Sequence, residues 1–190
     1  LLGTVDEISD YNFNINKLNK HFKVEPVDSF NLLELKSAGT ITGEGAAWFV
    51  LSSTPSENSI AAIVDVTSSS YVENTASWIE AFLLRNHVSP KEIDCLIFGN
   101  NGDASGDSLY DSVYNSLFSG ITQIVYKHLV GEYPTVSSFA VWLGAKILNG
   151  AALPEIFIKK QGVQVAPNRI LLYNHYSGEQ HNLILLNRIN

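Results

Sequence analysis

The sequence Cys-Leu-Ile-Phe-Gly-Asn-Asn-Gly-Asp-Ala-Ser-Gly-Asp at 95–107 is an apolar run that ends in a polar, glycine-containing loop. The same plan returns at 124–135, which reads Ile-Val-Tyr-Lys-His-Leu-Val-Gly-Glu-Tyr-Pro-Thr. A helical pattern follows each loop. Strands that alternate with helices are typical of a sheet with crossover helices on its faces. The stretch therefore predicts an α/β domain.

Apolar periodicity predicts helices around both loops. The apolar residues of 73–87, 108–118 and 136–148 recur at helical spacing and form one face of each segment. Asp107 and Thr135 precede the last two segments and are expected to cap them, because their side chains can accept a backbone N–H. Segment 136–148 is apolar nearly all round, which predicts a helix buried between two layers.

Strands are expected where short apolar runs are bounded by turn residues. They lie at 46–52, 58–67, 93–98, 121–126, 170–173 and 183–186. The first two are expected to pair as a hairpin, because turn residues separate them. Residues 8–40 are rich in Asn, Lys and Ser and form either a short helix near 10–22 or a loop-rich excursion. This order of elements predicts a mixed five-stranded sheet flanked by helices.

Composition limits the classes of function. The chain has 190 residues, of which 45% are hydrophobic and 16% charged, enough for one sizeable core and a surface that partly meets another surface. Its net charge is −7 and no basic stretch offsets it, which disfavours binding to nucleic acid or to anionic membranes. No run approaches the roughly 20 apolar residues of a spanning helix, so no membrane span is expected.

The single cysteine and the first residues bear on the setting of the protein. Cys95 cannot form an internal disulfide, so a reducing, cytoplasmic location is expected. It lies inside an apolar run, and a structural role is expected for it. The chain opens on Leu-Leu-Gly-Thr-Val-Asp-Glu without Met, which reads like the end of a strand. Residues 1–190 are therefore expected to be part of a longer protein, with a tag-cleaved start as the alternative.

Four local sequences resemble the C-terminal half of β-ketoacyl synthases, in the thiolase superfamily. Leu2–Glu7 is similar to the family's Gly-Gly-x-Asp/Glu strand end, and Gly43–Ala47 to its Gly-Glu-Gly-Ala. Lys127 followed by Gly131 is similar to Lys-x-x-x-Gly-His, and residues 174–182 lie where the family has Asn-Ser-Phe-Gly-Phe-Gly-Gly-x-Asn. The resemblance implies a thiolase-like half-fold, with residues 1–190 as a single C-terminal domain and the N-terminal half elsewhere.

The resemblance also implies a chemistry that uses no cofactor and no metal. A cysteine thiolate takes the acyl chain as a thioester, and two histidines stabilise the enolate oxygen formed on decarboxylation of a malonyl thioester. A lysine supports the electrostatics of this site. The family's nucleophile lies in its N-terminal half, so Cys95 is not that residue.

Both histidine positions hold other residues here. Registering the family's His-Gly-Thr-Gly-Thr loop on Gly102 and Asp107 places Gly99 at the first histidine, and a slip of one residue places Asn100 there. Glu132 stands at the second, where a carboxylate would repel an oxyanion unless protonated. Lys127 is kept and is expected to pair with Glu132 or Asp103, either as a remnant of the site or as a structural ion pair.

The resemblance assigns candidate residues to two roles. The positions that match the catalytic site are Lys127, Glu132 and Asn100, and the candidate substrate-binding residues are Asn101, Asp103, Gly178 and His181. Bulkier residues replace the family's glycines at 177–182. One of His128, His175 and His181 could replace a lost catalytic histidine, although surface or loop histidines are more common. Their spacing indicates no metal site.

Three hypotheses about function follow. The first is a catalytically degenerate β-ketoacyl synthase homologue in fatty acid or polyketide/aryl-polyene-type biosynthesis, which resembles the chain-length factors that partner an active synthase. Its partners would be an acyl carrier protein or acyl thioester, its own N-terminal half, and a synthase subunit in a homo- or heterodimer. The second is an active acyltransferase with altered catalytic residues and an upstream cysteine. The third is a self-standing interaction domain. The residue at the nucleophile turn of the full-length protein separates the first two.

Overall fold

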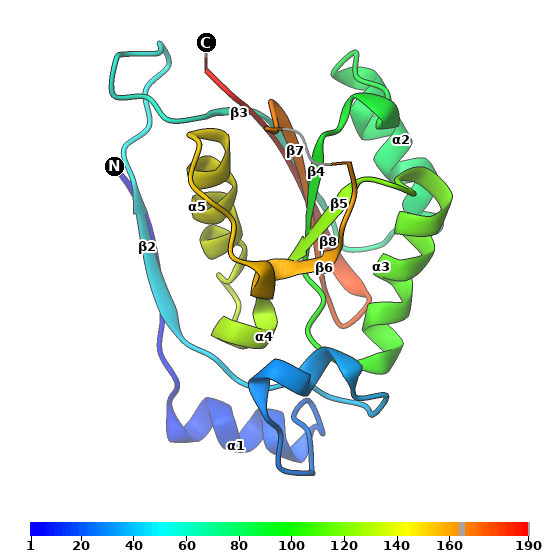
Figure 1. Ribbon diagram of the computed structural model, residues 1–190. Helices are drawn as coiled ribbons and strands as arrows, with labels where there is room; N and C mark the ends of the chain where they lie inside the picture. The colour runs from blue at the N-terminus through cyan, green and yellow to red at the C-terminus, as the bar shows by residue number, and fades with distance from the viewer. Residues whose placement is uncertain (164–165, 190) are drawn as a thin grey trace.

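A six-stranded mixed sheet runs through the middle of the molecule in the order β3-β8-β7-β4-β5-β6 (Figure 1). The computed structural model describes residues 1–163 and 166–189. A separate two-stranded ribbon pairs β1 with β2. The strands are β1 (Leu2–Asp6), β2 (Gly45–Phe49), β3 (Ala62–Ser69), β4 (Cys95–Phe98), β5 (Thr122–Val125), β6 (Ile158–Lys160), β7 (Arg169–Tyr176) and β8 (Glu179–Asn187).

Helices cover both faces of the sheet. In Figure 1, α2 and α3 lie on one side of it, and α5 lies on the other side between the sheet and β2. The α-helices are α1 (Asp10–Leu18), α2 (Thr75–Arg85), α3 (Ala104–Leu117), α4 (Lys127–Val130) and α5 (Ser137–Leu148). Short 3₁₀ turns are η1 (Ser29–Glu34), η2 (Pro90–Glu92) and η3 (Glu155–Phe157). The predicted α/β class, with a mixed sheet flanked by helices, is confirmed.

The central strand β4 shows why the sheet forms here. All four of its residues are buried, as expected for a strand covered on both faces. Leu96 and Phe98 belong to the core under α2 and α3, and Cys95 and Ile97 belong to the core under α5. Successive side chains of a strand point to opposite faces, so this short apolar run serves two cores at once.

Helix α5 is buried between two layers, as its sequence predicts. Ala140, Leu143 and Ile147 pack in the core under the sheet. On the far side, Thr4 of β1 donates from Oγ1 to Ser138 Oγ at 2.8 Å. The ribbon of β1 and β2 is therefore the outer layer over this helix (Figure 1).

Two predictions about the sheet are corrected. The strands expected at 46–52 and 58–67 do not pair as a hairpin, because β2 pairs with β1 and β3 pairs with β8. The residues between them carry the chain from the ribbon to the edge of the sheet. The sheet has six strands rather than five, because three-residue β6 adds to β5 at the other edge.

Both predicted helix caps are also corrected. Helix α3 begins earlier than expected, with Asp103 as its N-cap, so Asp107 lies inside the first turn. The Asp107 carboxylate instead accepts the backbone N–H groups of the preceding loop. Thr135 does not cap α5, because its Oγ1 and backbone N both donate to Asp6. Within segment 10–22, only α1 is an α-helix. The chain that follows, up to residue 40, contains the short 3₁₀ turn η1 and no further α-helix.

Candidate functional site

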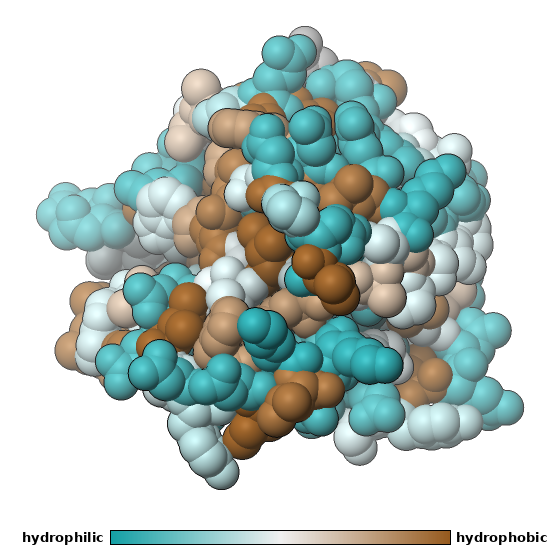
Figure 2. Space-filling model, turned by 90° about the horizontal axis from the view of Figure 1, so that it is seen from below, coloured by the Kyte–Doolittle hydropathy of each residue, from teal (hydrophilic) through white to brown (hydrophobic). Residues whose placement is uncertain are grey.

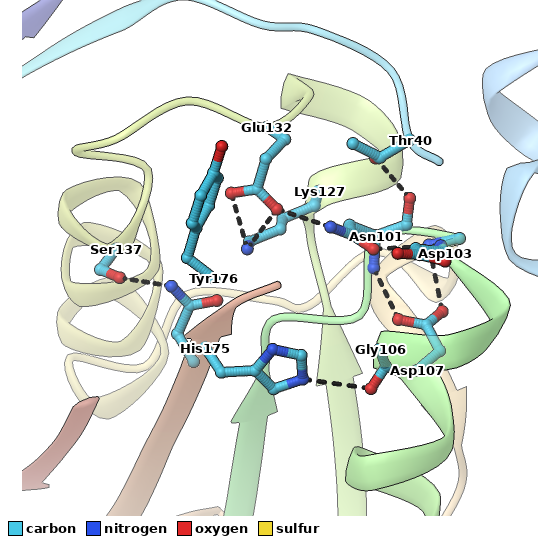
Figure 3. A network of polar contacts seen from close by, with 12 residues as sticks. Thr40, Asn101, Asp103, Gly106, Asp107, Lys127, Glu132, Ser137, His175 and Tyr176 are labelled. Atoms are coloured by element: carbon cyan, nitrogen blue, oxygen red, sulfur yellow. Dashed lines mark hydrogen bonds and ion pairs between the residues drawn. The ribbon is translucent and has the colours of Figure 1, made fainter. Parts of the chain in front are cut away.

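The candidate site lies where three parallel strands end. Strand β4 pairs in parallel with both β5 and β7, so the carboxyl ends of the three strands meet at one edge of the sheet. The polar loop 99–103 follows β4, and Lys127 to Glu132 follow β5. Figure 3 shows these two segments beside His175 and Tyr176 of β7. Such an edge is where open α/β sheets commonly bind ligands.

A buried ion pair joins Lys127 and Glu132. Lys127 Nζ lies 2.9 Å from Glu132 Oε1 and 2.7 Å from Oε2. The lysine side chain is 0% exposed and that of the glutamate 9%. Gly131, with φ +75°, ends α4 and turns the chain so that Glu132 returns over Lys127. A Cβ at Gly131 would lie 2.4 Å from Thr42 O, so the turn requires glycine.

Asn101 links this pair to the loop after β4. Its Nδ2 donates to Glu132 Oε2 at 2.7 Å, and its carbonyl accepts from Thr40 Oγ1 at 2.6 Å (Figure 3). The backbone N–H groups of Asn101 and Gly102 donate to the two Asp107 oxygens at 2.9 and 3.0 Å. Four hydrogen bonds to three residues therefore hold the loop before any ligand binds.

Burial shifts the pKa values of the charged groups in this cluster. It lowers the pKa of Lys127, although attraction to Glu132 and Asp107 opposes the shift. It also raises the pKa of Asp107, against the stabilising backbone N–H groups of Asn101 and Gly102. One buried cation thus lies among two carboxyl groups, those of Glu132 and Asp107.

A cavity of about 260 Å³ opens beside the ion pair. Asn101, Asp103 and Glu132 line it, and Tyr176 and His175 form the wall on the β7 side. The excursion after α1 supplies the opposite wall, where His21 stacks on Tyr176 with ring centroids 6.0 Å apart. The sequence did not indicate Thr40 or Tyr176 as site residues, because neither carries a local pattern and each is brought there by distant pairing.

The predicted site residues separate into two groups. Asn101, Asp103 and Glu132 line the cavity, and Lys127 joins them through its ion pair with Glu132. Asp103 N donates to Asn101 Oδ1 at 3.1 Å. Asn100 does not join them. It is 0% exposed, and its Oδ1 accepts from Gln123 Nε2 at 3.0 Å inside the core.

The other two predicted residues lie on the hairpin between β7 and β8. Gly178 and Ser177 have φ values of +73° and +54°, as in the tight turn that such hairpins favour. His181 is buried behind this turn, where Nδ1 accepts from Tyr173 OH at 2.8 Å and Nε2 donates to Gly178 O at 3.1 Å. It is not among the residues that line the cavity.

The three candidate histidines are not surface residues, and that expectation is corrected for them. His128, His175 and His181 are each at most 5% exposed. His175 accepts at Nδ1 from Gly178 N and donates from Nε2 to Gly106 O, both at 3.1 Å. It stacks on Tyr110 with centroids 4.4 Å apart, and burial lowers the pKa of His175 to about 4. Both ring nitrogens are therefore occupied in a neutral imidazole.

The position of Gly99 has no space for a side chain. A Cβ there would lie 2.0 Å from Asn174 Oδ1 and 2.6 Å from Tyr110 OH. These two groups also bond each other, since Tyr110 OH donates to Asn174 Oδ1 at 3.3 Å. Tyr110 OH accepts the backbone N–H of His175 at 2.9 Å as well. The space is thus filled by a buried polar network.

The surroundings of Cys95 do not favour a nucleophilic thiolate. It is 4% exposed in the core under α5, and burial raises the pKa of its thiol to about 12. The expected structural role agrees with this burial. Among residues 1–163 and 166–189, no cluster of His, Cys, Asp and Glu has the arrangement of a metal site. The same residues contain no helix that is both long enough and apolar enough to cross a bilayer.

Solved structures of ketosynthases share this architecture. The complex of a ketosynthase with its chain length factor from Xenorhabdus doucetiae matches with a TM-score of 0.72 and 18% identity, over 99% of this chain and 52% of that chain. The ishigamide ketosynthase/chain length factor matches with a TM-score of 0.70 and 15% identity, over 99% and 53%. A β-ketoacyl synthase from Burkholderia phymatum matches with 0.66 and 14%, over 99% and 54%.

The match is one of fold. Comparison with protein-family models and with curated protein sequences gives no match. The chain spans about half the length of the ketosynthase structures that it resembles. The architecture implied by the four sequence motifs is confirmed, and this chain has the thiolase-like fold of one half of a ketosynthase or chain length factor.

Proposed function

We propose that this chain is the C-terminal half of a chain-length-factor-like protein, a catalytically degenerate partner that supports an active ketosynthase. The observation that carries the proposal is the state of the two histidine positions. At Gly99 the space is filled by Tyr110 and Asn174. At Glu132 a carboxylate is held by a buried lysine.

The chemistry of condensation requires donors aimed at a developing oxyanion. Glu132 is an acceptor when ionised, so it would oppose that charge. Lys127 could offset it, but its ammonium contacts both Glu132 oxygens and is fully buried. The pair is therefore better suited to holding the loop after β5 than to stabilising an intermediate.

The buried histidines do not replace the missing ones in this proposal. His175 is directed to Gly106 O and Gly178 N, and His181 to Tyr173 and Gly178 O. Releasing either imidazole would leave buried polar groups unpaired, at a cost of about 1–3 kcal/mol each. Both histidines thus support the wall of the cavity.

The proposed partners are an acyl carrier protein or acyl thioester, the protein's own N-terminal half, and a synthase subunit. Support comes from solved relatives, one a ketosynthase in complex with its chain length factor and another a ketosynthase bound to its acyl-carrier protein. The outer ribbon also carries exposed apolar side chains, with Trp48 63% and Val5 62% exposed. Apolar patches of this kind mark interfaces.

An active acyltransferase is the alternative, and the open cavity beside Glu132 favours it. The test is an acyl-transfer and condensation assay on the full-length protein, alone and with a candidate synthase. The proposal expects no covalent acyl-enzyme and no condensation product from the protein alone, and a change in product when a synthase is present. A nucleophile-turn cysteine whose replacement by Ala abolishes acyl transfer would establish the alternative.

A further inference from the structure

A second cavity lies beside the first, between α1 and the extended residues 40–42. It has a volume of about 540 Å³, within the range of small-molecule sites. Lys20, Phe22 and Thr40 line both cavities, so they form the wall between them. The end of the molecule where α1 lies is seen in Figure 2, with brown apolar and teal hydrophilic side chains interleaved across it.

The floor of this second cavity is apolar. Phe13 of α1 stacks on Phe22 with ring centroids 5.2 Å apart, and Ile41 continues the surface. The aromatic pair fixes α1 against the chain that follows it, so the floor is formed by contacts within the protein. Burial of the methylene groups of a ligand on such a surface is favourable, because it removes apolar area from water.

The rim of the cavity is cationic. Lys17, Lys20 and Lys23 all line it and Glu25 is the one carboxylate there, in a chain of net charge −7. Lys23 Nζ is already used, because it donates to Ser37 O, Ser37 Oγ and Gly102 O. Within residues 1–163 and 166–189, Lys17 and Lys20 have no ion-pair partner. The exposed side chains of Lys17 and Lys20 thus lie at the rim of a cavity whose floor is apolar.

We propose that this cavity binds an amphipathic anion, a single-chain alkyl carboxylate, as a site separate from the Lys127–Glu132 cluster. The alkyl chain packs on Phe13, Phe22 and Ile41, and the carboxylate lies between Lys17 and Lys20. A carboxylate suits the rim better than a phosphate dianion, because the negative end of the α1 dipole and the Glu25 carboxylate lie beside these lysines and oppose a second negative charge.

The direct test is titration calorimetry of the protein with monomeric dodecanoate, below the concentration at which it forms micelles. The expected result is saturable binding at one site. Methyl dodecanoate, which lacks the charge, and acetate, which lacks the chain, are each expected to bind about tenfold more weakly or not at all. Dodecyl phosphate tests the head group and is expected to bind more weakly than dodecanoate.

Charge-reversal variants test whether the ligand binds beside Lys17 and Lys20. The double change Lys17→Glu and Lys20→Glu is expected to weaken dodecanoate about tenfold or more, because it turns attraction into repulsion. Lys91→Glu, an exposed lysine outside the cavity, is the matched control and is expected to leave the affinity within about twofold. Both variants change exposed residues, and circular dichroism confirms that they fold.

Three outcomes overturn the proposal. They are no saturable binding of dodecanoate, equal binding by the double variant and the wild type, and equal binding of the methyl ester. Binding to anionic vesicles without binding of monomeric dodecanoate would assign the lysines to a membrane surface instead. None of these results depends on whether the protein condenses acyl chains, so this proposal and the proposed function fail separately.

Discussion

Lys127 and Glu132 hold each other through two contacts, at 2.9 and 2.7 Å, with the lysine completely buried. The pair spans the turn at Gly131, and Asn101 joins it from the loop after β4. Two loops from neighbouring strands therefore depend on one charge-balanced cluster.

Removal of one member of the pair should destabilise the protein strongly. Lys127→Met leaves Glu132 without its counter-charge in a region of low water access, and about 3–5 kcal/mol of unfolding free energy should be lost. The double variant Lys127→Met/Glu132→Leu should recover a large part of that loss. Urea denaturation monitored by tryptophan fluorescence measures both.

The exposed pair Arg85–Asp65 is the matched control. Its side chains are 48% and 26% exposed, so Arg85→Ala should cost less than about 1 kcal/mol. Equal losses for Lys127→Met and Arg85→Ala would contradict the account of a buried cluster.

The filled space at Gly99 gives a steric prediction. Gly99→Ala places a methyl group against Asn174 and Tyr110 and should destabilise the protein by about 1–3 kcal/mol. Gly106→Ala is the contrast, because its Cβ would lie 3.2 Å from one His175 carbon, on a helix that favours alanine. Thermal unfolding compares the two, and a Gly99→Ala protein as stable as the wild type would show that the space is open.

The buried His175 predicts a pH dependence of stability. Its pKa is about 4 when folded and about 6.5 when unfolded, so the unfolded state binds more protons between these values. The contribution of neutral His175 to the free energy of unfolding is fully present above about pH 6.5. It falls as the pH drops toward 4, by about 3 kcal/mol at most. Unfolding free energies measured from pH 7 to pH 4 test this. His175→Gln should flatten the profile, and an unchanged slope in that variant would assign the loss to other groups.

Asn101, rather than Asn100, should matter to the Lys127–Glu132 cluster. Asn101→Leu removes the amide that donates to Glu132 Oε2 and should cost about 1.5–3 kcal/mol, the range for a hydrogen bond to a charged group. The loss should be much smaller when Lys127→Met/Glu132→Leu is already present, because the acceptor is gone. A double-mutant cycle by urea denaturation gives the coupling, and additive losses would contradict the contact.

Cys95 should be unreactive while the protein is folded. Its thiol is buried and its pKa is raised to about 12, so little thiolate exists at pH 8. Labelling with a disulfide reagent should be slow under native conditions and rapid in denaturant. Fast labelling of the folded protein would place the cysteine at the surface.

Local patterns predicted the central part of the fold. Strand β4, helix α3 and helix α5 were expected because four consecutive apolar residues, or apolar residues at helical spacing, signal their own burial. The pairing of β2 was not predicted correctly. Its partner β1 lies about forty residues earlier, and the turn residues after β2 favoured a local hairpin instead.

The site was predicted in part for the same reason. The short spacing between Lys127 and Glu132 made their pairing one of two expected outcomes. The choice between Gly99 and Asn100 for the first histidine position depended on the register of the loop after β4. The burial of Asn100 depends on Gln123 of the neighbouring strand, whose Nε2 donates to Asn100 Oδ1 in the core. The burial of His175 and His181 depends on Tyr110 and Tyr173, which only the folded chain brings beside them.

The proposed function is that of a protein that supports acyl condensation without performing it. The most direct measurement is condensation by the full-length protein supplied with an acyl thioester and a malonyl thioester on a carrier protein. The account predicts no product above background, and no difference between the wild type and a correctly folded Glu132→Gln variant. Product formation that depends on Glu132 or Lys127 would contradict it.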